Sequence, residues 1–476
     1  MRTLIEHLEF ILTVDSDDNV LKDASIVIDD DVITDVGPAE EIGQRYARAG
    51  FDQIVDGSHL GMTPGFIDSH VHLSETLSRA VFPDDIDTRT WVFHWAKPFY
   101  AHVDEEDEKT SVALACCEML RSGTTCFLDM GAQNDPAGTI PVLENIGMRG
   151  ITGQHAADNV PEKLPHGWSD EMVAHHFFAN ADIALAALGD TVEKWNGAGD
   201  GRIRVWVNIE GKEPCSLELH VGARALAEKY GVGTTYHIAT SIEEAKISEK
   251  KYGAWPVQRI ADAGGLGSNL VIAHGVALTD QEIALLKEYD TKVAFCPGTS
   301  FKLAKGAGAF GKYPELIEAG VTVCLGTDGV SASGNLNLMR QMYVVAGLFK
   351  DIRNDPTMVG ARMALRMATI DGAKALGWDE EIGSIEIGKK ADFVLFNLHH
   401  VEWTPYFDPL QALVWSASPN SIDQTWVNGR ALYSAGKVQT IDEETLFEDA
   451  RKRAKAIIER AGLSAEGVPK ATSLYE

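Results

Sequence analysis

The feature that most constrains the fold is a long alternation of short apolar strands with helical segments, from about residue 60 to residue 380. Strands are expected at the apolar runs 66–72, 124–129, 203–209, 233–237, 270–274, 292–296 and 321–328. Strands that alternate with helices pair in parallel through crossover connections. So many units in one run favour a closed (β/α)₈ barrel over an open sheet.

Both ends of the chain have a different pattern. Residues 24–28 and 32–38 flank an acidic turn and predict a hairpin. Past about residue 383, apolar runs at 385–388, 391–396 and 424–430 predict strands again. The economical arrangement is one small β domain made from 1–59 plus 383–440, a barrel at 60–382, and a helix and tail at 441–476.

Composition limits the partners and the compartment. The chain of 476 residues has a formal net charge of −28, which repels phosphate backbones and anionic membranes. We therefore expect no nucleic acid or membrane partner. The six cysteines form no C-x-x-C pair and predict free thiols in a reducing cytoplasm. Charges among residues 2–9 are untypical of a signal peptide, so we expect a cytoplasmic protein.

Several expected strands end in metal-binding residue types. His70 and His72 share one face of a strand because residues i and i+2 point the same way. A lone His-X-His pair is weak, since fifteen histidines produce such spacings by chance. Three further strands, however, end near His237, His274 and Asp328. The ends of parallel strands gather at the C-terminal rim of a barrel, where active sites are built.

Three imidazoles and one carboxylate meeting there predict a site for one divalent metal ion with a position left for water. Such an ion lowers the pKa of bound water toward neutrality. Asp328 would accept the water's proton, His274 would polarise the scissile bond or hold the nucleophile, and Gly329 would leave room for substrate. Asp68, deeper on its strand, is expected to support the ligands. Zinc is the expected ion, with cobalt or iron as alternatives.

These motifs resemble the metal-dependent amidohydrolase superfamily, in the branch of cytosine and guanine deaminases and s-triazine chlorohydrolases. The resemblance spans nearly the whole chain and rests on Pro64–His72, Ser122–Thr125, Tyr236–His237, Ala273–Gly275, Cys296–Pro297, Gly326–Gly329 and Ile382–Asp392. It implies a distorted (β/α)₈ barrel, a small β-sandwich formed by both termini, and a homo-oligomer. It also implies one catalytic metal ion with His274 beside it. The four residues that would hold this ion are His70, His72, His237 and Asp328.

The departures from that pattern bear on the substrate. Deaminases of this branch carry a glutamate where Thr240 stands here, and threonine cannot shuttle a proton at neutral pH. Glu210 stands where many relatives have a histidine. Glu210 and Glu75 are candidate replacement acids, or equally salt-bridged rim residues; with Thr240 they are the candidate substrate contacts. Lys212, if carbamylated, could bridge a second metal, although the ligand pattern suits one.

Other residues could line a substrate pocket. Four histidines after the third strand are expected mostly at the surface: His155, His166, His175 and His176. Trp91, Phe93 and Trp95 are expected in the core, with an aromatic substrate wall as the alternative.

The expected function is that of a metal-dependent hydrolase that cleaves a C–N bond of a small neutral molecule. Amides, ureas, carbamates and thiocarbamates are the expected substrates, which places the chain near hydrolases of phenylurea and thiocarbamate (molinate) herbicides. The alternative is an aminohydrolase (deaminase) or chlorohydrolase acting on a nucleobase-like or triazine ring. A non-catalytic barrel is disfavoured because all the expected ligands are present.

Overall fold

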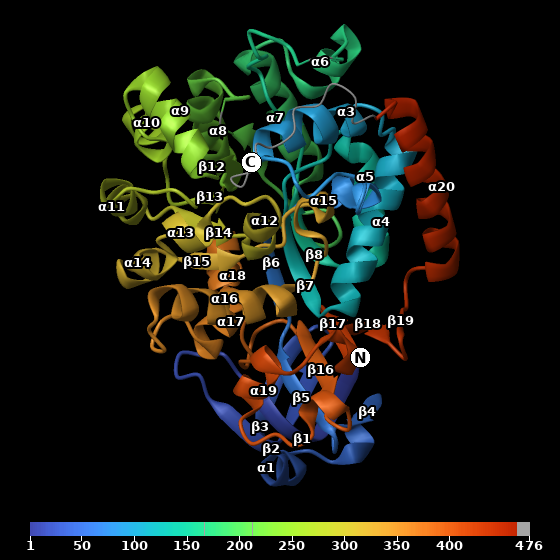
Figure 1. The fold of residues 1–476 in the computed structure, drawn as a ribbon. Coiled ribbons are helices and arrows are strands. Elements are labelled where there is room, and N and C mark those ends of the chain that lie inside the picture. The colour runs from blue at the N-terminus through green and yellow to red at the C-terminus, as the bar shows by residue number, and fades with distance from the viewer. Residues whose placement is uncertain (166, 212, 464–476) are drawn as a thin grey trace.

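The computed structural model describes residues 1–165, 167–211 and 213–463, and it confirms the expected α/β barrel (Figure 1). Its parallel strands run in the orders β10-β8-β7-β6 and β15-β14-β13-β12-β11-β9. Short interruptions divide β8 from β9 and β10 from β11, so the barrel is distorted. Within the described residues the barrel strands are β6 (Phe66–Val71), β7 (Thr124–Asp129), β8 (Arg149–Thr152), β9 (His155–Ala156), β10 (Ile203–Val205), β11 (Val207–Gly211), β12 (Thr234–Ile238), β13 (Leu270–His274), β14 (Lys292–Phe295) and β15 (Val323–Leu325).

Helices cover the outside of the barrel. Side chains at their first residues explain where several begin: the capping boxes of Asp104 and Thr279 start α4 and α11. The longer helices are α4 (Glu105–Arg121), α5 (Pro136–Ile146), α7 (Ala181–Trp195), α8 (Leu217–Tyr230), α9 (Ile242–Tyr252), α11 (Asp280–Glu288), α16 (Leu338–Arg353) and α20 (Glu443–Ala461). The shorter ones are α1 (Ala39–Arg45), α2 (Thr88–Thr90), α3 (Lys97–Tyr100), α6 (Asp170–His176), α10 (Pro256–Asp262), α12 (Pro297–Lys302), α13 (Ala307–Phe310), α14 (Tyr313–Glu318), α15 (Val330–Ser333), α17 (Ala361–Met367), α18 (Ile370–Leu376) and α19 (Pro409–Trp415).

The barrel closes between β6 and β15. Val71 and Asp328 form a parallel bridge, and the amide of Asp328 donates to the carbonyl of His70 at 2.8 Å. This seam places the residues after β15 directly against those at the end of β6.

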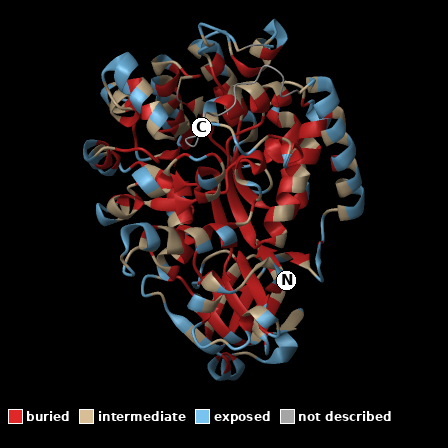
Figure 2. Cartoon of the chain, in the orientation of Figure 1, coloured by how far each residue is buried: buried red, intermediate tan, exposed pale blue. Residues whose placement is uncertain are grey.

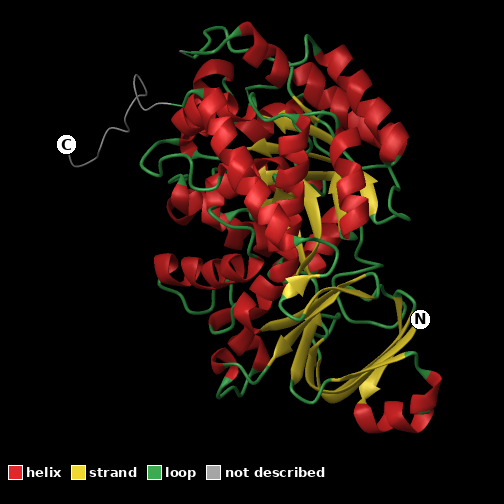
Figure 3. Cartoon of the chain, turned by 90° about the vertical axis from the view of Figure 1, so that its right-hand side faces the viewer, coloured by secondary structure: helices red, strands yellow, loops and turns green. Residues whose placement is uncertain are grey.

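Both termini contribute to one sheet, which has nine strands in the described part of the chain. Its blue N-terminal and orange to red C-terminal strands lie together in Figure 1, and Figure 3 shows the sheet below the barrel. Its order is β19-β18-β17-β16-β5-β1-β2-β3, with β4 paired to β1. Because β5 belongs to this sheet, the chain enters the barrel at Gly65 rather than at residue 60. The strands are β1 (Arg2–Leu12), β2 (Val20–Asp29), β3 (Val32–Pro38), β4 (Gln53–Asp56), β5 (Leu60–Pro64), β16 (Phe393–Asn397), β17 (Ile422–Val427), β18 (Arg430–Ser434) and β19 (Lys437–Val438).

The strand expected at 385–388 is wrong. That segment crosses between two N-terminal strands instead: Ile385 donates its amide to the carbonyl of Thr13, and Gly388 donates to that of Ile33. The sheet has its own apolar core, in which Phe393 stacks on Trp426 with ring centres 5.2 Å apart. Figure 2 shows the barrel strands and this sheet as largely buried.

A covering segment follows β6 and carries α2, η3 (Trp91–Ala96, a π-helical turn) and α3. Its aromatic side chains form a cluster with Ala450 and Ile457 of α20. Helix α20 also packs along α4, where Arg453 Nη1 lies 3.1 Å from Asp107 Oδ1 (Figure 1). The last described helix therefore holds the covering segment down. No helix in the described ranges combines the length and apolar content needed to cross a membrane.

Candidate metal centre and substrate cavity

The expected ligand residues come together at the C-terminal ends of their strands. His72 Nε2 lies 3.1 Å from His237 Nε2 and 3.2 Å from Asp328 Oδ1, and His70 Nε2 lies 3.5 Å from the same oxygen. One ligand atom from each of these four residues lies within 4.8 Å of the others. His70, His72 and Asp328 are buried, and His237 is half-buried.

The donor set fits a divalent metal ion. Among the described residues, neither ring nitrogen of His70 has a hydrogen-bond partner, although the side chain is fully buried. An unpaired buried polar group is costly, and two Nε2 atoms that face each other at 3.1 Å need a cation or a proton between them. Burial alone would raise the pKa of Asp328, but the adjacent imidazoles of His70 and His72 hold that pKa well below its usual value. Three imidazoles and an ionised carboxylate are a usual metal site.

Groups behind the ligands fix their orientation. His237 Nδ1 lies 2.7 Å from the carbonyl oxygen of Glu210, which leaves Nε2 to face the site. His72 Nδ1 lies 3.3 Å from Glu75 Oε1, an ion-pair contact without hydrogen-bond alignment. Gly329 makes room for Glu75 rather than for substrate: a Cβ on Gly329 would lie 2.1 Å from Glu75 Oε2.

Asp68 lies behind the cluster. Its carboxylate accepts hydrogen bonds from the amide and the hydroxyl of Thr327, and burial raises its pKa to about 7. It thereby ties β6 to the turn that carries Asp328.

The backbone is strained at two site residues. His274 has φ 77° and Asp328 has φ 65°, the left-handed region that non-glycine residues rarely adopt. Such strain persists where the surrounding structure enforces it, and it clusters at functional sites. His274 is further fixed by Tyr313, whose hydroxyl donates to its carbonyl at 2.8 Å, and its Nε2 lies 3.7 Å from Asp328 Oδ2.

A cavity opens beside these residues. An ion pair lies in its wall, with Lys97 Nζ 2.7 Å from Glu210 Oε2, and both side chains are largely buried. Burial lowers the pKa of His155 to about 4 and that of His176 well below its usual value, so both rings are neutral at pH 7. The cavity is lined by His72, Glu75, Trp91, Lys97, Tyr100, His155, His176, Glu210, His237, His274, Lys305 and Asp328, among others.

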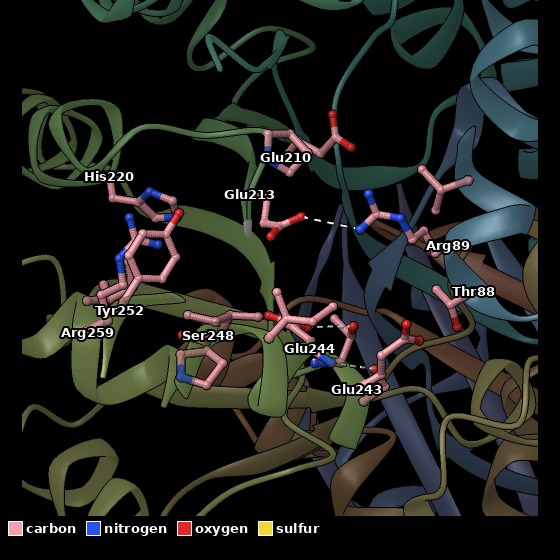
Figure 4. Close-up of a pocket in the computed structure, with 18 of the residues that line it drawn as sticks. Thr88, Arg89, Glu210, Glu213, His220, Glu243, Glu244, Ser248, Tyr252 and Arg259 are labelled. Carbon is pink, nitrogen blue, oxygen red and sulfur yellow. Dashed lines mark hydrogen bonds and ion pairs between the residues drawn. The ribbon is translucent and has the colours of Figure 1, made fainter. Parts of the chain in front are cut away.

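A second compartment adjoins the first, and Thr88, Val92 and Glu210 line both (Figure 4). We call it the annex. Its walls are mainly apolar, with Phe93, Pro214, Ile238, Ile247 and Ile260 among them. At its rim Arg89 lies 3.8 Å from Glu213.

Thr240 lines the annex rather than the metal-site cavity. Its hydroxyl donates to Glu244 Oε2 at 2.7 Å, and its amide donates to the same oxygen at 2.7 Å. Glu244, one helical turn further on, is therefore held at the start of α9 by Thr240.

The residues predicted to line a pocket lie in three different places. His155 and His176 line the metal-site cavity together with Trp91, and Phe93 lines the annex. Trp95 packs in the aromatic core cluster. Lys212 and His166 lie outside the described residues.

Two cavity lysines were missed, Lys97 and Lys305. Neither follows an expected strand, and a lysine outside such a position is normally solvated. A signal existed for Lys305, which sits in an apolar, glycine-rich stretch after the Cys296–Pro297 motif.

The chain matches the Amidohydrolase family over residues 62–432. The 5'-deoxyadenosine deaminase of Methanosarcina barkeri is 33% identical over 464 residues, which cover 97% of this chain and 99% of that protein. A methylthioadenosine/S-adenosylhomocysteine deaminase of Moorella thermoacetica is 34% identical over 428 residues, 90% of this chain and 94% of that protein. These relatives are similar over their full length.

A solved structure of an adenosine deaminase from Xanthomonas campestris with bound zinc has a TM-score of 0.84 and 28% identity, over 96% of this chain and 98% of that one. The zinc complex of atrazine chlorohydrolase from Arthrobacter aurescens has a TM-score of 0.83 over 95% of this chain and 100% of that one; at 22% identity it shows the fold alone. The family match confirms the expected hydrolase of carbon–nitrogen bonds. This chain is a member of the amidohydrolase family.

Proposed function

We propose that the chain is a zinc-dependent aminohydrolase that releases ammonia from a carbon of a nucleobase-like ring, with neutral adenine nucleosides as the substrate class. The observation that carries this proposal is the cluster of His70, His72, His237 and Asp328 beside a cavity. Full-length similarity to two deaminases of adenine nucleosides supports the ring substrate over our first expectation, an amide or urea. The zinc of the Xanthomonas campestris enzyme supports zinc as the ion.

The chain's own residues supply proton handling and orientation. A divalent ion held by the four ligands would make water acidic enough to attack near neutral pH. Asp328, ionised and facing His274, takes the proton from that water as its oxygen bonds to the ring carbon. The π pair of the adjacent C=N bond moves to nitrogen and then returns as the bond to the amino group breaks. The proton on Asp328 leaves with the amine.

The two compartments suit an elongated neutral substrate. A ring in the metal-site cavity can extend past Glu210 into the annex, where apolar walls would contact the remainder of the molecule. Carboxylates outnumber cations among the annex residues, with Glu213, Glu243 and Glu244 facing Arg89 and Arg259. That imbalance disfavours phosphorylated ligands, so we expect nucleosides to react and nucleotides to be rejected.

A second candidate is hydrolysis of a urea, carbamate or thiocarbamate, including phenylurea or thiocarbamate herbicides. Thr240 favours it, because a titratable group is missing where deaminases of this branch carry a glutamate. The relatives described above give it no support.

The experiment is a substrate panel on the zinc-loaded chain. Ammonia release from adenosine, 5'-deoxyadenosine, methylthioadenosine, guanine and cytosine is compared with amine release from a phenylurea and a thiocarbamate. Asp328→Asn is the inactive control. Turnover of an adenine nucleoside supports the proposal, and amine release from ureas alone would favour the second candidate. No turnover in either group would refute both.

A further inference from the structure

Lys305 places an ammonium group in the wall of the metal-site cavity. The side chain is buried, with 5% exposure, and its Nζ lies 3.2 Å from Nε2 of His274. It lines the same cavity as His72, His237 and Asp328. A buried ammonium is costly and is therefore unusual without a task.

The local backbone directs this side chain inward. Ala304 has φ 48° and Gly306 has φ 88°, so left-handed residues flank Lys305 on both sides. An alanine in this conformation is strained. Ser300 holds the turn: its carbonyl accepts from the amide of Lys305 at 3.0 Å, and its hydroxyl accepts from the amide of Ala307 at 3.0 Å.

The contact with His274 sets the direction of its hydrogen bonds. An ammonium can only donate, so the Nε2 atom of His274 accepts, and that ring carries its hydrogen on Nδ1 when neutral. The Nε2 acceptor of His274 and the ammonium of Lys305 therefore lie side by side, next to the carboxylate of Asp328. Glu75 and Glu210 are the other acids that line the cavity, with Lys97 paired to Glu210.

We propose that Lys305 is a catalytic residue whose ammonium contacts the ring nitrogen next to the reacting carbon. When water adds to that carbon, the π pair moves to this nitrogen, and a donor held in place by the protein stabilises the new charge. Deaminases of this branch place a glutamate three residues after the histidine that corresponds to His237, where Thr240 here faces the annex. Lys305 supplies a charged donor from the segment after β14 instead. This inference rests on the proposed aminohydrolase function.

The test compares Lys305→Met and Lys305→Arg with a matched control, Lys302→Met. Lys302 lies on α12, one turn earlier, and donates to the carbonyl of Ser331. We expect Lys305→Met to lower kcat by about 10²–10³-fold with KM changed less than about threefold, because one preorganised donor has that effect. Lys305→Arg should recover part of the loss, and Lys302→Met should stay near wild type. Zinc content per chain should be equal in all four proteins.

Other results would overturn the assignment. These are a kcat for Lys305→Met within threefold of wild type, a loss confined to KM, or an arginine variant no better than methionine. A zinc content that falls with kcat would make Lys305 a structural residue and would also refute the inference.

A second readout does not need the substrate. Inorganic phosphate is titrated against the cobalt-loaded chain and followed by the cobalt absorption spectrum. Wild type should bind phosphate at least tenfold more tightly than Lys305→Met, because the cation contacts ligands in the cavity. Equal affinity would refute the role of Lys305 even if no nucleoside is turned over, whereas tighter binding without turnover would leave Lys305 in place and refute the aminohydrolase function.

Discussion

His72 and His237 are 165 positions apart in the sequence, yet their Nε2 atoms lie 3.1 Å from each other. Neither imidazole can donate to the other if both are neutral with their hydrogens on Nδ1, as the carbonyl of Glu210 dictates for His237. A metal ion bound by both Nε2 atoms would satisfy the two rings, and the first prediction concerns that ion.

His237→Ala removes one of the four ligands. We expect the purified variant to hold far less zinc than wild type and to lose turnover, as His72→Ala and Asp328→Asn should. Because an ion that binds the folded chain alone stabilises it, chelation should lower the Tm of wild type and leave that of His237→Ala nearly unchanged. Metal analysis and thermal unfolding check this. Full zinc content in the variant would contradict it.

Gly329→Ala tests the support behind His72. The new methyl group would displace Glu75, whose Oε2 would lie 2.1 Å from it, and so loosen the contact to His72 Nδ1. Since the displaced atom ends a flexible side chain, we expect little change in Tm but zinc affinity reduced about 10–100-fold. Competition with a chelator measures this affinity. Gly334→Ala, at a position with open space but a left-handed backbone, should show the reverse: lower Tm and normal affinity.

Asp392→Ala tests the joint between barrel and sheet. Arg149 Nε lies 2.9 Å from Asp392 Oδ2, and both side chains are almost fully buried. Removing the carboxylate leaves the buried guanidinium without its counter-ion and with only Asn428 Oδ1 as a side-chain acceptor. We therefore expect a loss of about 3–5 kcal/mol in the free energy of unfolding. Urea unfolding measures it. Glu448→Ala, which breaks an exposed pair with Lys452, should have little effect. A comparable loss in both variants would contradict the prediction.

His220 makes stability depend on pH. Burial lowers its pKa from 6.5 to about 4. Between those values the unfolded chain takes up a proton that the folded chain does not, so stability is present above pH 6.5 and is lost as the pH falls toward 4. The loss from this residue between pH 7 and pH 5 is about 2 kcal/mol.

We expect His220→Gln to remove that part of the pH dependence, measured as the difference in unfolding free energy at pH 7 and pH 5. His59→Gln, at an exposed position, serves as the control and should keep the wild-type dependence. If the unfolding free energy changes equally between pH 7 and pH 5 in wild type and His220→Gln, His220 is not the group that causes the pH dependence.

Much of the fold follows from local pattern. The alternation of strands and helices, and imidazole or carboxylate residues at strand ends, are properties of short segments read one at a time. A parallel barrel has one rim where such strand ends can meet. The sequence is therefore enough to predict His70, His72, His237 and Asp328 as candidate metal ligands. The broken strand at Trp206 was not predictable, because an apolar run gives no sign of an interruption that serves packing.

What the sequence by itself determined is the class of fold and the candidate metal ligands, since periodicity and strand-end chemistry are local. Tertiary structure alone decided the roles of the remaining side chains. Glu75 stands behind His72, Glu210 pairs with Lys97, and Thr240 turns to the annex while Lys305 points to His274. Those roles depend on which segments the barrel brings within a few ångströms of one another. The separation of two residues along the chain does not predict their distance in the folded structure.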